Sequence, residues 1–318
     1  MRVAFRSSQV FSSPAHPALI ATHTGGQTLK QSGFALGPQS KGAASGVQAS
    51  TAPHNGPGPA SRRLTPSVTR TDVTIQKGNH MDLKGTADRL EDLLGLQSPA
   101  IALAFVDRPP DAVKEFTGEA PSACSFWRSA ETGVFFAPAR SHGNCAVGAM
   151  VMGFSSIDLR ESLTESVEMM VGSSYLTPEE PANIPSVAED SAGIVYGPLR
   201  DCPLEPDVVL VWLSPAQAML FGEAGGNLAW TDSAAGVLGR PACATLPLAL
   251  STRSPQLSLG CIGMRTFTEV SDDRLLGVLP GAVAASFAES LQATKDANGR
   301  MAAHYQERKE TISHLSRT

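Results

Sequence analysis

Four of the five cysteines in this chain share one sequence setting, where a hydrophobic run meets a turn of small residues. They are Cys124 in SACSFW, Cys145 in HGNCAVG, Cys243 in RPACATLP and Cys261 in LSLGCIG. Thiolates are soft ligands that hold zinc or iron–sulfur clusters, and four of them complete a tetrahedral or cubane site. The shared setting predicts that these cysteines form one metal site.

The spacing of the cysteines is a weaker signal than their setting. Zinc ribbons and ferredoxins carry close CxxC pairs, and this sequence has none. Cysteines dispersed through a domain large enough to fold without a metal favour an iron–sulfur cluster, with zinc as the alternative. The competing interpretation is four ordinary core cysteines. Cys202, between Asp201 and Pro203 in a polar loop, is left out of the predicted site.

Cys145 is also a candidate nucleophile, with His142 as its partner. Both lie in the short loop HGNC, whose glycine lets the chain present a side chain at low steric cost. A neighbouring histidine lowers the pKa of a thiol and makes it reactive. The simpler interpretation is a loop histidine beside a buried cysteine.

The clearest local unit joins a strand to a helix with almost no loop. The run DVVLVWL, residues 207–213, is uninterruptedly apolar, and Ser214, Pro215 and Gln217 then have the pattern of a helix start. Such a junction lies at the carboxyl edge of an α/β sheet, where ligands bind. As a plain N-cap, Ser214 needs no ligand to explain it.

This junction supports a second hypothesis, an enzyme or carrier for a small organic ligand such as a tetrapyrrole. Cys145 or His142 would then be the reactive group or axial ligand. The remaining contacts would come from Trp127, Trp212 and Ser214. Tryptophans in apolar runs are more often simple core residues, so both interpretations stay open. A third hypothesis is a non-enzymatic partner-binding protein that uses its acidic helices and its charged C-terminal tail.

The charge distribution divides the chain. The chain has 25 Lys and Arg and 30 Asp and Glu, and the first 80 residues hold eight of the basic residues and one of the acids. The remaining residues therefore contain 17 basic and 29 acidic side chains, a formal charge of −12. That acidity disfavours nucleic acid as a partner. No run approaches the roughly 20 apolar residues of a membrane span. A small molecule or a redox partner protein, in the cytoplasm, is the expected interaction, and the oligomeric state stays open.

Residues 1–80 are basic, acid-poor and rich in Ser, Gly, Ala and Pro. Such a composition buries too little apolar surface to fold, so we expect a disordered leader. It is either translated sequence upstream of a true start at Met81 or an organelle transit peptide, in which case the protein is imported.

The rest of the pattern alternates helices and strands. Helices are expected over residues 82–96 with Gly95 as C-cap, after a capping box at Asp158 to Glu161, and over 281–297 with Gly299 as the stop. Strands are expected in AIALAFV, GVFFAPAR, AGIVYGPL, PQLSLGCIGMRTF and LLGVLP. We predict an α/β fold, with a mixed or mostly parallel sheet flanked by helices. It spans residues 81–300 as one compact domain or two closely joined lobes, before a polar tail at 301–318.

These pieces resemble the uncharacterised archaeal-conserved-region (ArCR) family, domain of unknown function one-six-nine. The matching segments are LLGLQSPAIALAF, SACSFWRSA, HGNCAVGAMVMGF, GIVYGPLRDCPLEPDVVLVWLSPAQAMLF, GRPACATLPLAL and LSLGCIGMR, spanning Met81 to about Leu291. The resemblance implies cysteines at the positions of Cys124, Cys145, Cys243 and Cys261, no match to Cys202, and a start near Met81. It implies no activity. Members often have Cys-Pro-Gly-Gly where this chain reads Cys145-Ala146-Val147-Gly148, which puts the turn after Cys145 in question.

Overall fold

A seven-stranded sheet organises the part of the chain that the computed structural model describes, residues 82–188, 190–225, 237–238 and 240–315. The predicted leader, residues 1–80, lies outside these residues. The strands in chain order are β1 Ile101–Val106, β2 Phe135–Pro138, β3 Gly193–Pro198, β4 Val208–Leu213, β5 Val237–Leu238, β6 Gln256–Ser258 and β7 Leu275–Pro280. Their order across the sheet is β2-β3-β1-β4-β7-β6-β5.

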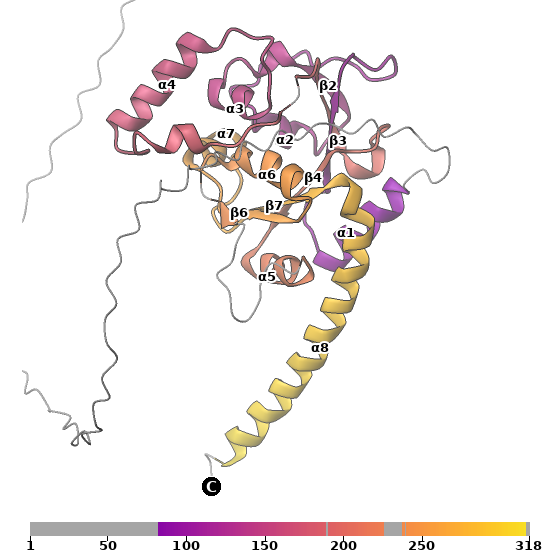
Figure 1. Ribbon diagram of the computed structural model, residues 1–318. Coiled ribbons are helices and arrows are strands. Elements are labelled where there is room, and N and C mark those ends of the chain that lie inside the picture. The colour runs from indigo at the N-terminus through magenta and orange to yellow at the C-terminus, as the bar shows by residue number, and fades with distance from the viewer. Residues whose placement is uncertain (1–81, 189, 226–236, 239, 316–318) are drawn as a thin grey trace, which may run out of the picture. The chain divides into compact units, whose positions relative to one another are not determined.

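Helices cover both faces of this sheet (Figure 1). On one face lie α1 Leu83–Leu94, α5 Pro215–Ala224 and the start of α8 Ala284–Leu315. On the other lie α2 Ser125–Ser129, α3 Ala146–Val151, α6 Thr245–Thr252 and α7 Ile262–Thr268, and α4 Arg160–Gly172 packs against α3. The architecture is therefore α/β with three layers.

The central strands alternate their side chains between the two cores. In β4, Val208, Leu210 and Trp212 join the core that also holds α2 and α6, while Val209 and Val211 join the core under α1, α5 and α8. Successive side chains of a strand point to opposite faces, and here both faces are covered. This explains why the strand sequences are uninterrupted apolar runs.

The sheet is mixed, and of the two predicted alternatives the mostly parallel sheet is wrong. Five of the strand pairs are antiparallel, β1–β3, β1–β4, β2–β3, β4–β7 and β6–β7, and among the described residues only β5–β6 is parallel. A continuous apolar run indicates that both faces of a strand are buried. Here helices bury both faces of strands that pair in the antiparallel direction. Strand direction is set by the connections, and the sequence pattern carries no signal for it.

Two element boundaries also differ from expectation. Helix α8 continues through Gly299 to Leu315, because one glycine costs a helix only about 1 kcal/mol and the flanking residues are good helix formers. In the segment predicted as one long strand, β6 ends at Ser258, Gly260 adopts a positive φ of 84°, and α7 starts after Cys261. The helix after Asp158 is present as α4, although it begins at Arg160 without a side-chain cap.

Several predictions about elements are confirmed. Asp82 caps α1 by accepting a hydrogen bond from the Gly85 N–H, and Gly95 ends the helix in the left-handed conformation. Ser214 and Gln217 form a capping box at the start of α5, with Pro215 at the first helical position. Among the described helices, none is long and apolar enough to cross a membrane.

Candidate functional site

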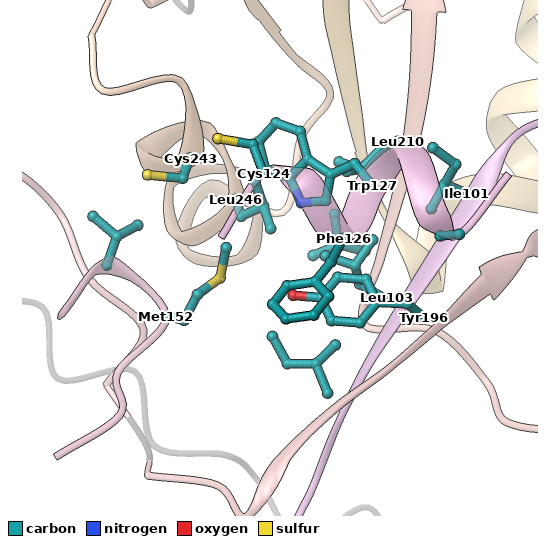
Figure 2. Close-up of a cluster of buried hydrophobic side chains, with 14 of the residues drawn as sticks. Ile101, Leu103, Cys124, Phe126, Trp127, Met152, Tyr196, Leu210, Cys243 and Leu246 are labelled. Carbon is teal, nitrogen blue, oxygen red and sulfur yellow. The ribbon is translucent and has the colours of Figure 1, made fainter. Parts of the chain in front are cut away.

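The four predicted cysteines come from separate segments and lie on the same face of the sheet. Cys124, Cys145 and Cys261 are the N-cap residues of α2, α3 and α7, and Cys243 lies in the short 3₁₀ turn Ala242–Ala244 before α6. Figure 2 shows Cys124 and Cys243 side by side at the edge of the buried cluster around Trp127 and Leu246. The fold thus brings together residues up to 137 positions apart, from 124 to 261.

Electrostatic coupling shows how closely the thiols are grouped. The charges of Cys145 and Cys261 raise the pKa of Cys124, and the charges of Cys124, Cys145 and Cys261 all raise the pKa of Cys243. Five of the six possible pairs therefore interact. Like charges disfavour ionisation only when they are near one another, so Cys124 and Cys243 each have the other three thiols in their surroundings.

Burial divides the four into two pairs. Cys124 and Cys243 are buried, whereas Cys145 and Cys261 are partly exposed. Desolvation is the largest influence on the buried pair: it raises the pKa of Cys124 to about 12 and that of Cys243 well above its ordinary value. At neutral pH both are neutral thiols, and they become thiolates only beside a compensating positive charge.

Hydrogen bonds position two of the sulfur atoms, and a glycine leaves space for a third. The Ser122 hydroxyl donates to the Cys124 Sγ at 3.5 Å, and the backbone N–H of Met264 donates to the Cys261 Sγ at 3.4 Å. Gly148 gives Cys145 its room, because a Cβ at position 148 would lie 2.9 Å from the Cys145 Sγ and 2.6 Å from the Ala123 Cβ. The first turn of α3 thus packs closely against the start of α2.

Within the described residues, no group of three or more His, Cys, Asp or Glu side chains is arranged to hold a metal ion. The four thiols share one region and all are free cysteines. Cys202 is also free, but it belongs to the core on the opposite face of the sheet. Its exclusion from the predicted site agrees with that position.

His142 is a buried residue, although its loop suggested a surface position. Its Nδ1 lies 3.1 Å from the Pro138 carbonyl oxygen, which can only accept, so Nδ1 carries the proton. Its Nε2 then accepts from the Tyr196 hydroxyl at 3.0 Å. Burial lowers the pKa of His142 to about 4. The structure links His142 to Cys145 through the backbone, where the Cys145 N–H donates to the His142 carbonyl, and both ring nitrogens face other partners.

Tyr196 is a residue of this region that the sequence reasoning missed. It is fully buried on β3, and burial, reinforced by the charges of Cys124 and Cys243, raises its pKa well above the ordinary value. The tyrosine and His142 therefore form a neutral hydrogen-bonded pair beside the thiols. A lone hydroxyl in the otherwise apolar strand GIVYGP was the available signal.

The predicted ligand-contacting residues are partly brought together. Trp127 and Trp212 lie with ring centroids 6.2 Å apart. The Trp127 indole N–H is buried without a hydrogen-bond partner among the described residues, while that of Trp212 donates to Glu131 Oε1 at 2.9 Å. Ser214 serves as the cap of α5, with its hydroxyl accepting from the Gln217 N–H.

Comparison with protein families matches residues 89–290, more than half of the chain, to a family described as uncharacterised ArCR. The chain belongs to the ArCR family. No curated protein and no solved structure matches it significantly.

The ArCR match runs from within α1 to within α8 and so encloses the whole sheet. All four clustered cysteines, His142, Tyr196 and both tryptophans lie inside it. Two of the three positions after Cys145 suit the Cys-Pro-Gly-Gly turn that the resemblance implies. Ala146 occupies the first helical position of α3, where proline is also favoured, and Gly148 retains the glycine that the close packing requires.

Proposed function

We propose that this ArCR protein binds an iron–sulfur cluster through Cys124, Cys145, Cys243 and Cys261 and serves electron transfer, sensing or redox catalysis. The observation that carries the proposal is the placement of four cysteines from four distant segments at or just before helix starts on one face of the sheet, and the coupling of Cys124 and Cys243 to the other thiols supports it. Four grouped cysteines match the ligand number of such clusters. When bound, the cluster would supply one-electron chemistry.

Because the buried thiols are protonated at neutral pH, they would become ligands only for a group that carries a strong positive charge. Without one, Cys124 and Cys243 hold their protons at neutral pH, and ionising several of the four thiols together is opposed by their mutual repulsion. Metal ions reverse both effects, because they replace the protons and offset the negative charges. Binding would therefore release protons and weaken as the pH falls.

An iron–sulfur cluster is preferred over structural zinc because of the size of the fold. Both faces of the sheet carry a hydrophobic core that includes fully buried aromatic residues, Trp127 and Phe126 on one side and Phe221 on the other. A domain with two such cores folds without a metal ion to stabilise it. The thiols are then available for chemistry in place of a structural role.

The two partly exposed cysteines mark the side from which electrons would enter or leave. Leu259 and Ile262, which flank Cys261, have exposed fractions of 54% and 66%. Exposed apolar side chains beside a redox centre suit transient docking of a redox partner protein. Tyr175 lies nearby, with its hydroxyl accepting from the Ile262 N–H at 3.4 Å.

The test is anaerobic purification of the full chain, followed by iron, sulfide and zinc analysis and a visible spectrum. We expect coloured protein containing iron and acid-labile sulfide. Cys124→Ser, Cys145→Ser, Cys243→Ser and Cys261→Ser should each lower the iron content strongly. Cys202→Ser is the matched control, since it removes a buried thiol from the other core, and it should keep its iron. Colourless protein, or zinc without sulfide, contradicts the proposal.

A second candidate function is a carrier or enzyme for a small organic molecule, and the position of Trp212 favours it, although its cavity is too small for the tetrapyrrole suggested by the sequence. This residue lines a cavity of about 300 Å³ at the end of β4. Cys145 does not line this cavity, so a ligand bound there would be held by the cavity residues and not by the thiol. Loss of ligand binding in Trp212→Ala, with binding retained in Cys145→Ser, Cys243→Ser and Cys261→Ser, would favour this function over a shared cluster.

A further inference from the structure

The cavity beside Trp212 is a separate place where charged side chains from several segments meet. It lies where β4 ends and where β1 and β7 begin, and its lining includes Gln97, Arg128, Glu131, Trp212, Ser271 and Arg274. At about 30 Å³ for each water molecule, its volume of about 300 Å³ corresponds to about ten waters. A small organic molecule fits that space.

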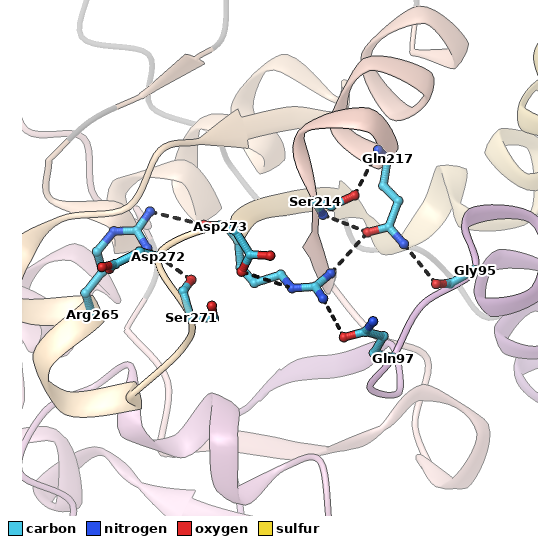
Figure 3. A network of polar contacts seen from close by, with 9 residues as sticks. Gly95, Gln97, Ser214, Gln217, Arg265, Ser271, Asp272 and Asp273 are labelled. Atoms are coloured by element: carbon cyan, nitrogen blue, oxygen red, sulfur yellow. Dashed lines mark hydrogen bonds and ion pairs between the residues drawn. The ribbon is translucent and has the colours of Figure 1, made fainter.

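Arg274 is the most firmly positioned charge in this cavity. Its side chain is only 16% exposed, and its guanidinium donates to Gln217 Oε1 at 3.4 Å and to Gln97 Oε1. Gln217 is itself fixed, because its amide nitrogen donates to the carbonyls of Leu94 and Gly95 at 2.9 and 2.8 Å. Figure 3 shows these contacts converging from the loop after α1, the start of α5 and the segment before β7.

A second arginine fixes the segment that carries Arg274. Arg265, on α7, donates to the backbone carbonyls of Leu259, Ser271 and Arg274 at 2.7, 3.3 and 3.1 Å. These bonds tie residues 271–274 to α7 (Figure 3). The guanidinium of Arg274 is thus held before any ligand arrives, which reduces the entropy lost on binding.

The charged side chains that line the cavity differ in how completely they are paired with opposite charges. Arg128 Nη1 contacts both oxygens of Glu131 at 2.6 and 2.7 Å, and Glu131 also accepts from Trp212, so that carboxylate is fully engaged. Arg274 has two neutral amides as its close partners. Its nearest carboxylate, Asp273, is 3.7 Å away and 63% exposed, and Glu269 on the cavity wall is exposed to solvent. A mostly buried cation with amide partners retains attraction for an anion.

We propose that this cavity binds a small organic carboxylate, with its carboxylate group paired to Arg274 and its carbon chain against the Trp212 indole. The planar guanidinium matches a carboxylate with two parallel hydrogen bonds. The indole supplies the apolar wall that small-molecule sites require. This site is distinct from the cysteine cluster and does not depend on a bound metal.

Calorimetric titration of the full chain with malonate, succinate and glutarate at low salt tests the proposal. Succinamide, which has the shape of succinate without its charge, is the ligand control. We expect at least one dicarboxylate to bind and succinamide not to bind. In Arg274→Gln the Kd should rise roughly tenfold or more, as expected for loss of a charge-assisted pair. Arg200→Gln, which removes an arginine that pairs with Asp88 and Glu91 elsewhere, should bind as the unmodified protein does.

Two further measurements keep the test decisive if Arg274→Gln folds poorly. Arg274→Lys keeps the charge but loses the paired donors, so its Kd should also rise. Quenching of tryptophan fluorescence by the dicarboxylate should disappear in Trp212→Phe. The proposal is overturned if no dicarboxylate binds, if Arg274→Lys and a folded Arg274→Gln bind unchanged, or if succinamide binds as tightly as succinate. Cys145→Ser should bind the dicarboxylate normally, which separates this site from the proposed cluster.

Discussion

Replacing Gly148 with alanine tests the packing that places Cys145 beside the other thiols. The added methyl group would lie 2.6 Å from the Ala123 Cβ and 2.9 Å from the Cys145 Sγ. Carbon atoms in contact normally lie about 3.5–4.0 Å apart, so α3 must move by roughly 1 Å relative to α2. Overpacking of this kind costs about 1–3 kcal/mol. The gain of helix propensity on replacing glycine offsets about 0.5–1 kcal/mol of that cost.

We therefore expect Gly148→Ala to lower the free energy of unfolding by about 1–2 kcal/mol. Gly263→Ala is the matched control, because Gly263 lies two residues after Cys261 in α7 and a Cβ there meets nothing within 4 Å. This control should keep or raise stability by about 0.5–1 kcal/mol. Urea unfolding followed by tryptophan fluorescence measures both.

The same pair of variants separates packing from metal binding. Gly148→Ala displaces the Cys145 sulfur, so its iron content should fall, whereas Gly263→Ala should retain iron. A Gly148→Ala protein as stable as the unmodified chain and with full iron content would refute the close contact between α3 and the start of α2.

Two further predictions concern single side chains. Because burial lowers the pKa of His142 from 6.5 to about 4, only the unfolded chain is protonated there between these pH values. The stability that neutral His142 provides is complete above pH 6.5 and is lost as the pH falls toward 4, by about 2 kcal/mol at pH 5. Urea unfolding at pH 7.5 and 5 should show this loss in the unmodified chain and a smaller one in His142→Gln. Ser214→Ala removes the α5 cap and should cost about 1 kcal/mol, with Ser214→Asp restoring it; an unchanged melting temperature in Ser214→Ala would contradict the capping role.

The elements of the fold were largely predictable because their signals are local. Asp82 with Gly95, and Ser214 with Gln217, fix helix ends through contacts within a few residues. The buried run at β4 was equally clear. Strand direction was not predictable, because pairings such as β1 with β4 join segments about 100 residues apart and depend on the whole topology.

The grouping of the cysteines was predictable from their shared setting, but their different environments were not. Cys124 is buried and Cys261 partly exposed, although both stand where a hydrophobic run meets a turn of small residues and both occupy the N-cap position of a short helix. The burial of His142 was hidden in the same way, since a Gly-bearing loop gives no sign that Tyr196 will cover its ring. The Arg274 cavity had no sequence signal at all, because its parts meet only once β1, β4 and β7 are assembled.

Helices α2 and α7 connect the two proposed sites. Helix α2 starts at Cys124 and leads to Arg128 and Glu131 in the cavity wall, and α7 starts at Cys261 and leads to Ser271. The two helices pack against each other. At 1.5 Å per residue they are only about 8 and 11 Å long. Trp127 of α2 and Trp212 on the cavity wall have ring centroids 6.2 Å apart, so the buried face of α2 also packs beside the cavity wall. The two proposals are tested independently, because Arg274→Gln should weaken carboxylate binding while leaving the iron content unchanged.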